Sequence, residues 1–185
     1  MKYKLVVCDM DGTLLTSSHK ISEYTANIIK QIEDKNVKFI IATGRPYLDA
    51  RYYRDSLNLK SYLITSNGAR AHDEDNNPIV VENIPKELVK RLLTYNVGKD
   101  IHRNIYLNDD WIIEYEIEGL IEFHKESGYR FNIDDLNKYE NEEAAKVFFL
   151  GKDRKFRKKY GKRISKWFKY NCFLIFLFRI YEKGC

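Results

Sequence analysis

The chain has 185 residues, of which 44% are hydrophobic and 32% are charged, and its formal net charge is +5. This length and composition predict a soluble globular protein with one domain, or one domain plus a small insert. Lys2 and Lys4 precede only four apolar residues, and no stretch approaches the ~20 apolar residues of a membrane span, so we expect a cytoplasmic protein with no signal peptide and no membrane partner.

The net positive charge comes from the C-terminal end of the chain. Residues 151–185 contain 12 Lys and Arg but 2 Asp and Glu, whereas 20 basic and 25 acidic residues precede them. A nucleic-acid-binding surface spread over a folded domain would not change sign at one point, so we expect no nucleic-acid partner. The three cysteines, Cys8, Cys172 and Cys185, show neither even pairing nor metal-ligand spacing, and reduced thiols are the simplest interpretation.

The N-terminal part of the chain alternates strand and helix patterns. Residues 4–8 predict a short buried strand, and Ser22 predicts the N-cap of a helix. Residues 37–42 predict a second strand, residues 47–57 a helix, and residues 62–65 a third strand. This alternation predicts parallel β-α-β units, and hence an α/β fold.

A polar motif follows each of these three strands: DMDGTLL at 9–15, TGRP at 43–46 and SNGA at 66–69. An open parallel sheet binds its ligands beyond the carboxyl ends of the strands. We therefore expect Asp9, Asp11, Thr43, Gly44 and Asn67 to share one rim of the sheet.

The pattern changes further along the chain. Residues 75–78 predict a hairpin turn, 85–95 a helix, 104–116 two strands around a turn at 108–110, and 146–150 another strand. From about residue 83 this indicates a small α+β unit. The run DEDNN at 73–77 predicts a solvated turn and not a calcium loop, because it lacks the required glycine and distal glutamate. The four histidines, His19, His72, His102 and His124, lie in polar stretches, and we expect surface positions for them.

Asp9 and Asp11 indicate a chemical function. Two carboxylates this close repel each other unless a cation or a proton lies between them, although a solvated turn at a strand end is the alternative interpretation. One carboxylate can attack phosphorus to give an aspartyl-phosphate, while the other supplies and removes protons. The phosphate charge then calls for Mg²⁺, a hydroxyl and backbone N–H donors. The candidate residues for this set are Asp9, Asp11, Gly12, Thr13, Thr43 and Gly44.

VVCDMDGTLL, IIATGRP and ITSNGA, in this order, resemble the haloacid dehalogenase-like hydrolases and, within them, the Cof-type phosphatases. The resemblance implies a Rossmann-like parallel sheet core with an inserted α+β cap. Residues 1–82 would form the N-terminal part of the core and residues 83–150 a partial cap.

The resemblance also implies roles for individual residues. Asp9 would be the phosphorylated nucleophile and Asp11 the general acid/base. Mg²⁺ would bind to the Asp9 carboxylate and the Asp11 backbone carbonyl, and Thr43 would donate a hydrogen bond to the phosphoryl group. Arg45 and Asn67 lie in matching segments, where a phosphate-binding role and a structural use as turn residues both remain open.

Two later motifs of the family, a lysine and a Gly-Asp pair with further acids, are not found in the chain. We therefore expect a core that is incomplete in its C-terminal half. Residues 151–185 are interpreted as truncated or frameshifted sequence, because a reading one base out of frame, with synonymous codons chosen freely, resembles the family's continuation. The alternative is a native basic and apolar tail, in which residues 172–178 form a buried strand or, together with residues 159–170, a membrane-surface anchor.

These observations predict a Mg²⁺-dependent phosphatase of small phosphorylated metabolites, with sugar phosphates as the class that the resemblance implies. Its activity in this chain would be impaired by the missing motifs. The alternatives are a non-catalytic remnant that binds phosphate or a partner, and a phosphomutase.

Overall fold

The computed structural model describes residues 3–96, 98, 101–117 and 119–151, so the predictions for residues 152–185 lie outside the described residues. The chain divides into two compact units. The first consists of the described residues within Met1–Glu82 and Glu118–Arg130, and the second consists of those within Asn83–Ile117 and Phe131–Cys185.

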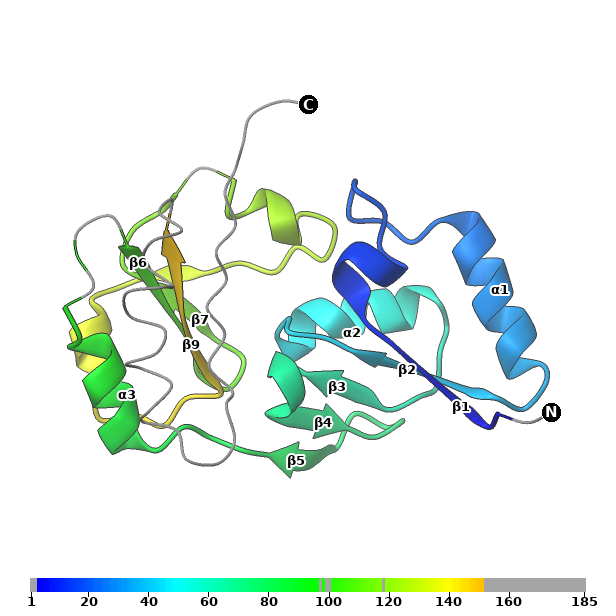
Figure 1. Cartoon of the computed structure of the whole chain (residues 1–185), viewed down its shortest axis with the longest axis horizontal. Helices are drawn as coiled ribbons and strands as arrows, with labels where there is room; N and C mark the ends of the chain where they lie inside the picture. The colour runs from blue at the N-terminus through cyan, green and yellow to red at the C-terminus, as the bar shows by residue number, and fades with distance from the viewer. Residues whose placement is uncertain (1–2, 97, 99–100, 118, 152–185) are drawn as a thin grey trace. The chain divides into compact units, whose positions relative to one another are not determined.

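A five-stranded sheet forms the centre of the first unit (Figure 1). Its strands lie in the order β1 (Leu5–Cys8), β2 (Lys38–Ala42), β3 (Leu63–Thr65), β4 (Arg70–His72) and β5 (Pro78–Val81). The first three strands are parallel, with Cys8 opposite Ile41 and Ala42 opposite Ile64, which confirms the predicted β-α-β units. β4 and β5 extend the sheet as an antiparallel hairpin, and the predicted turn between them forms over residues 73–77.

Two helices connect the parallel strands, as predicted: α1 (Glu23–Glu33) and α2 (Tyr47–Ser56). The Ser22 hydroxyl accepts the Thr25 N–H at 3.1 Å, which is the predicted N-cap. Both helices share one core with the sheet, in which Ile29 of α1 and Tyr53 of α2 are buried together with Phe39 of β2. Burial of side chains of this size stabilises a fold by ~1.5–3 kcal/mol each, and it fixes the strand ends relative to the helices.

The predicted burial of the first strand is wrong for half of its residues. Leu5 and Val7 are 48% and 53% exposed, while Val6 and Cys8 pack against the core. Among the described strands β1 has one neighbour, β2, and therefore lies at the edge of the sheet. Leu5 and Val7 alternate with Val6 and Cys8, so they lie on the face of the sheet opposite this core, and an apolar run does not show whether both faces of its strand are covered.

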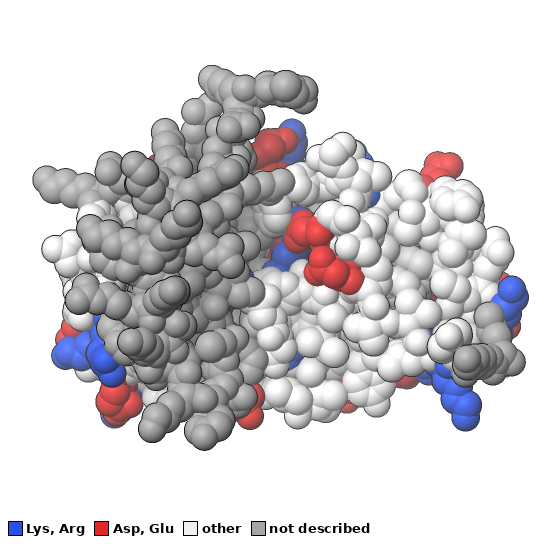
Figure 2. Space-filling view, in the orientation of Figure 1, with Lys and Arg blue, Asp and Glu red and all other residues white. Residues whose placement is uncertain are grey.

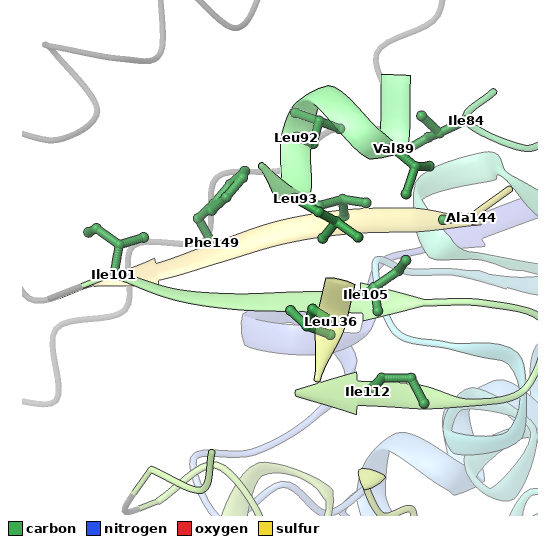
Figure 3. Packing of buried hydrophobic residues seen from close by; sticks show 11 residues of the cluster. Ile84, Val89, Leu92, Leu93, Ile101, Ile105, Ile112, Leu136, Ala144 and Phe149 are labelled. Atoms are coloured by element: carbon green, nitrogen blue, oxygen red, sulfur yellow. The ribbon is translucent and has the colours of Figure 1, made fainter. Parts of the chain in front are cut away.

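The second unit packs one helix on a four-stranded sheet, as its predicted α+β character requires. The strand order is β8 (Asn132–Ile133), β7 (Trp111–Ile113), β6 (Ile101–Tyr106) and β9 (Lys146–Gly151), with α3 (Lys86–Leu93) on one face. β6 pairs antiparallel with both β7 and β9. Figure 3 shows Val89, Leu92 and Leu93 of α3 packed with Ile105 of β6 and Phe149 of β9.

Along the strands of the second sheet, the residues between these core residues point to the opposite face, and several of them carry buried polar groups. The Trp111 indole N–H donates to Asn104 Oδ1 at 3.0 Å, and Asn104 Nδ2 lies 3.0 Å from His102 Nδ1. Lys146 on β9 is 2% exposed, and its Nζ lies 5.0 Å from the centre of the Phe148 ring. Burial lowers the pKa of Lys146 to about 8, because the charged ammonium loses its hydration.

Three histidines are buried, which contradicts the prediction that they lie at the surface. His72, His102 and His124 are 7%, 3% and 4% exposed. The His72 ring stacks on Tyr47 with 3.6 Å between ring centres, and His102 and His124 engage in hydrogen bonds. Polar neighbours in the sequence did not predict exposure, because burial depends on contacts that the local sequence does not show. His72 and His124 contact residues distant in the chain, and His102 lies within a sheet.

Residues 119–130 fall within the range predicted for the cap, but they group with the first unit. They contain the short 3-10 helix Glu122–His124. The division into a core over 1–82 and a cap over 83–150 stays a prediction.

Charged side chains are dispersed over the surface in view. Figure 2 shows Lys and Arg of the described residues scattered on this face and not gathered in one patch. Within the described part of the chain, no helix has both the length and the apolar character needed to cross a bilayer.

Candidate active site

The candidate site lies where β1, β2 and β3 end next to one another. The Thr43 N–H donates to the Ile64 carbonyl at 2.9 Å, and the Asn67 N–H donates to the Thr43 carbonyl at 3.0 Å. The first bond joins the residue after β2 to β3 itself, and the second joins it to the segment that follows β3, while Asp9 follows Cys8 at the end of the adjacent β1. Three of the predicted polar motifs therefore begin at neighbouring strand ends.

A tight turn carries the two carboxylates. The Leu14 N–H donates to the Asp9 carbonyl at 3.2 Å, and Met10 and Leu14 are buried in the core, which anchors the turn. Gly12 has a φ of +78°, a left-handed conformation that glycine adopts without a steric penalty. The predicted residues of this turn remain accessible: Asp9, Gly12 and Thr13 are exposed and Asp11 is half-buried.

Arg45 holds the side chain of Asp11. Its Nε and Nη2 donate to the two carboxylate oxygens of Asp11 at 2.9 and 2.7 Å, while Nη1 donates to Asp49 Oδ2 at 3.0 Å. Arg45 is 3% exposed. Burial opposes its charge, but the hydrogen bonds and charges of Asp11 and Asp49 outweigh burial and hold the pKa of the guanidinium above its ordinary value.

Asp49 is a fully buried carboxylate with three partners. Its Oδ2 accepts hydrogen bonds from Arg45 and from His124 Nδ1, the latter at 2.7 Å, and its Oδ1 accepts one from the Ser127 hydroxyl. Burial acts to raise the pKa of Asp49, but the His124 hydrogen bond, the charges of His124 and Arg45 and the Ser127 hydrogen bond outweigh it, so the pKa lies below its ordinary value. Asp49 is therefore a charged group inside the protein.

Thr43, Gly44 and Asn67 form a close-packed corner beside these charges. The Thr43 hydroxyl accepts the Arg45 N–H at 3.2 Å. A Cβ on Gly44 would lie 2.6 Å from Asn67 Oδ1, so any other residue at this position would force the Asn67 side chain to move. Asn67 Nδ2 is buried and has no hydrogen-bond partner within the described part of the chain, which makes it a donor available to an incoming acceptor.

The turn that carries Asp9 and Asp11 contains the oxygens expected to bind Mg²⁺. Because Arg45 engages both oxygens of the Asp11 carboxylate, the available donors are the Asp9 carboxylate and the Asp11 backbone carbonyl. Among the residues that the structure describes, no group of three or more His, Cys, Asp or Glu could hold a metal ion. Mg²⁺ takes oxygen ligands and keeps several waters, so these two oxygens are of the chemical type that would serve as part of its ligand set.

One cavity belongs to the second unit. It has a volume of about 450 Å³ and is lined among others by Tyr95, Arg103, Glu114 and Tyr115. None of the predicted site residues lines it.

Sequence reasoning did not find three residues that contact the site. Asp49 lies four residues after Arg45 on α2, and this spacing of opposite charges is a signal that could have indicated an ion pair. His124 and Ser127 lie far away in the sequence, and no local pattern connects them to Asp49.

A family model described as haloacid dehalogenase-like hydrolase matches residues 6–184. A putative phosphatase of Haemophilus influenzae is 35% identical over 156 residues, which cover 82% of this chain and 57% of that protein. The HMP-PP phosphatase of Serratia proteamaculans is 31% identical over 150 residues, covering 80% of this chain and 55% of that protein. The chain thus spans just over half the length of these relatives.

Among solved structures, the HAD subclass IIB sugar phosphatase BT4131 matches with a TM-score of 0.64 at 23% sequence identity. The match covers 76% of this chain and 56% of that chain. At this identity the likeness concerns the fold, and it confirms the predicted Rossmann-like α/β class.

Proposed function

This chain belongs to the haloacid dehalogenase-like hydrolases, and we propose that it is a Mg²⁺-dependent phosphatase of small phosphorylated metabolites that works through an aspartyl-phosphate. The observation that carries the proposal is the juxtaposition at the strand ends. Asp9 and Asp11 follow β1, and Arg45, two residues after Thr43, binds Asp11 directly.

In the proposed reaction a carboxylate oxygen of Asp9 attacks phosphorus, and the bond from phosphorus to the leaving alcohol oxygen breaks. Asp11 gives that oxygen a proton. Asp11 then takes a proton from a water molecule, whose oxygen attacks the phosphorus of the aspartyl-phosphate, releasing inorganic phosphate and restoring Asp9. Mg²⁺, when bound by the Asp9 carboxylate and the Asp11 carbonyl, offsets the negative charge of the phosphoryl group.

The remaining predicted residues would orient the phosphoryl group. The Thr43 hydroxyl and the Asn67 amide can donate hydrogen bonds to its oxygens, and the buried Asn67 Nδ2 without a partner supports this role. Gly12, Thr13 and Gly44 would offer backbone N–H or hydroxyl donors. Arg45 would act mainly on Asp11, because Asp11 and Asp49 already occupy its guanidinium.

The proposed substrate class draws on the relatives. One relative is named HMP-PP phosphatase and one structural neighbour is named a sugar phosphatase, and both names support a small phosphorylated metabolite as substrate. Sugar phosphates are the first compounds to test.

We also propose that this chain turns over slowly. The lysine and Gly-Asp motifs expected from the family are not in its sequence. Loss of one electrostatic group at such a site costs about 2.7–4 kcal/mol, or roughly 10² to 10³ in rate.

Hydrolysis of p-nitrophenyl phosphate with Mg²⁺ and with excess EDTA tests the proposal. Activity should require Mg²⁺ and should fall on the order of 10³-fold or more in Asp9→Asn, because this variant lacks the nucleophile. Asp34→Asn is the matched control, since Asp34 is exposed at the end of α1 and should leave the rate unchanged. Equal rates in Asp9→Asn and the wild type would remove Asp9 from its proposed role.

Two other outcomes identify the alternatives. Saturable binding of inorganic phosphate without turnover would support the non-catalytic remnant. A requirement for a bisphosphate activator would support the phosphomutase.

A further inference from the structure

We propose that residues 119–130, here called the strap, position the side chain of Asp11 through His124, Asp49 and Arg45. This inference rests on the proposed function, because it concerns the residue proposed as general acid/base. His124, Asp49 and Arg45 would be positioning residues, since they act on Asp11 and not on the substrate.

The first step is the contact between Arg45 and Asp11. A bidentate pair between a planar guanidinium and a carboxylate fixes the carboxylate plane as well as its distance. The Asp11 side chain is 34% exposed, whereas that of Arg45 is 2% exposed. The buried guanidinium is therefore the rigid partner, and it sets the orientation of the more accessible carboxylate.

The second step is the contact between Arg45 and Asp49. Two carboxylates share this one guanidinium, so the cation alone does not neutralise both. The Asp49 side chain is 0% exposed, so water does not solvate its negative charge. Its remaining hydrogen bonds come from His124 and Ser127, which both belong to the strap.

The third step is the direct contact of the strap with Arg45. The Phe123 ring centre lies 4.3 Å from Arg45 Cζ, a cation–π distance, and the ring also packs edge-on against His19 at 4.9 Å. Lys20 Nζ also lies 3.5 Å from a carboxylate oxygen of Glu126 in the strap. The strap thus covers one face of the Arg45 guanidinium with Phe123, and it donates hydrogen bonds to Asp49, the second carboxylate that Arg45 contacts.

These contacts give the strap control over Asp11. Without the His124 donor, the negative charge of Asp49 would be less well compensated and would attract Arg45 more strongly. The two hydrogen bonds from Arg45 to Asp11 would then weaken. Asp11 and the turn that carries it would then become more mobile.

Hydrogen exchange measured by mass spectrometry on the full chain tests the coupling without any need for catalysis. In His124→Leu, exchange should rise at least about tenfold in peptides from the strap and in peptides covering residues 9–15, as expected for loss of a hydrogen bond to a charged group. His124→Asn should restore the wild-type rates, because the asparagine amide places a donor close to the position of Nδ1. His102→Leu, which removes a buried imidazole from the second unit, should leave both peptides unchanged.

Kinetics with p-nitrophenyl phosphate give a second readout. His124→Leu should lower kcat about tenfold with KM within twofold of wild type, and His124→Asn should recover kcat, because Asp11 acts in proton transfer and not in substrate binding. If His124→Leu fails to fold, Ser127→Ala takes its place, since it removes one donor to Asp49.

The outcomes separate this inference from the proposed function. Faster exchange in the strap with unchanged exchange in residues 9–15 would overturn the inference, whether or not the protein is active. Exchange that rises in both segments of a protein with no phosphatase activity would support the coupling and contradict the proposed function.

Discussion

Replacement of Lys146 by methionine is expected to stabilise the protein at neutral pH. Lys146 is 2% exposed on β9, and burial lowers its pKa from 10.5 to about 8. Since one pKa unit corresponds to about 1.4 kcal/mol, keeping the proton on the buried amine costs about 3 kcal/mol. Methionine has a similar length and flexibility but no charge, so the free energy of unfolding should rise by up to about 3 kcal/mol.

The sign of the effect follows from proton binding. From about pH 8 to pH 10.5 the unfolded chain holds more protons at Lys146 than the folded chain does, so the wild-type free energy of unfolding increases with pH over this interval. Lys146→Met lacks the titrating group. Its advantage over the wild type should therefore be largest below pH 8 and should shrink as the pH approaches 10.5.

Urea unfolding at about pH 7, 8.5 and 10 measures this difference. Trp111 is buried in the same unit, and a Trp167→Phe background makes it the sole tryptophan. Lys60→Met serves as the control, because Lys60 is exposed and its replacement should change stability little at any pH. A stability difference between Lys146→Met and wild type that is constant across the pH range would refute the reasoning.

Three further predictions concern single residues. Gly44→Ala should destabilise the protein by about 1–3 kcal/mol in thermal or urea unfolding and shift the Asn67 amide NMR signals, because the new Cβ meets Asn67 Oδ1 at 2.6 Å; unchanged signals would contradict this contact. Trp111→Phe should cost about 1–3 kcal/mol, since it leaves the buried Asn104 Oδ1 without its donor, and an unchanged free energy of unfolding would argue against this hydrogen bond. Burial lowers the pKa of His102 from 6.5, so below pH 6.5 the unfolded chain binds more protons than the folded chain, and the free energy of unfolding of the wild type should fall as the pH drops. His102→Gln should reduce this dependence on pH, and equal pH dependence in variant and wild type would rule out His102 as its source.

The secondary structure could be predicted because its signals are local. The apolar runs, the Ser22 cap and the turn at 73–77 each depend on neighbouring residues, and the structure contains the corresponding elements. Burial depends on distant parts of the chain. Leu5 and Val7 are exposed and His102 is buried, and neither fact has a local signature.

The candidate site divides in the same way. The motifs that contain Asp9, Asp11, Thr43 and Asn67 were visible because each follows a strand. The hydrogen bond between Asp49 and His124 joins residues separated by 75 positions, so it depends on how residues 119–130 fold back. Such a contact has no periodicity and no spacing rule that sequence inspection could use.

The position of β1 also has a bearing on how the protein behaves in solution. Among the described strands β1 pairs with β2 alone, and a strand edge without a partner can pair with another extended chain. A second molecule that added its own strand there would clamp the backbone one residue before Asp9. Dilution series should therefore accompany rate measurements, because self-association at this margin would act on the nucleophile itself.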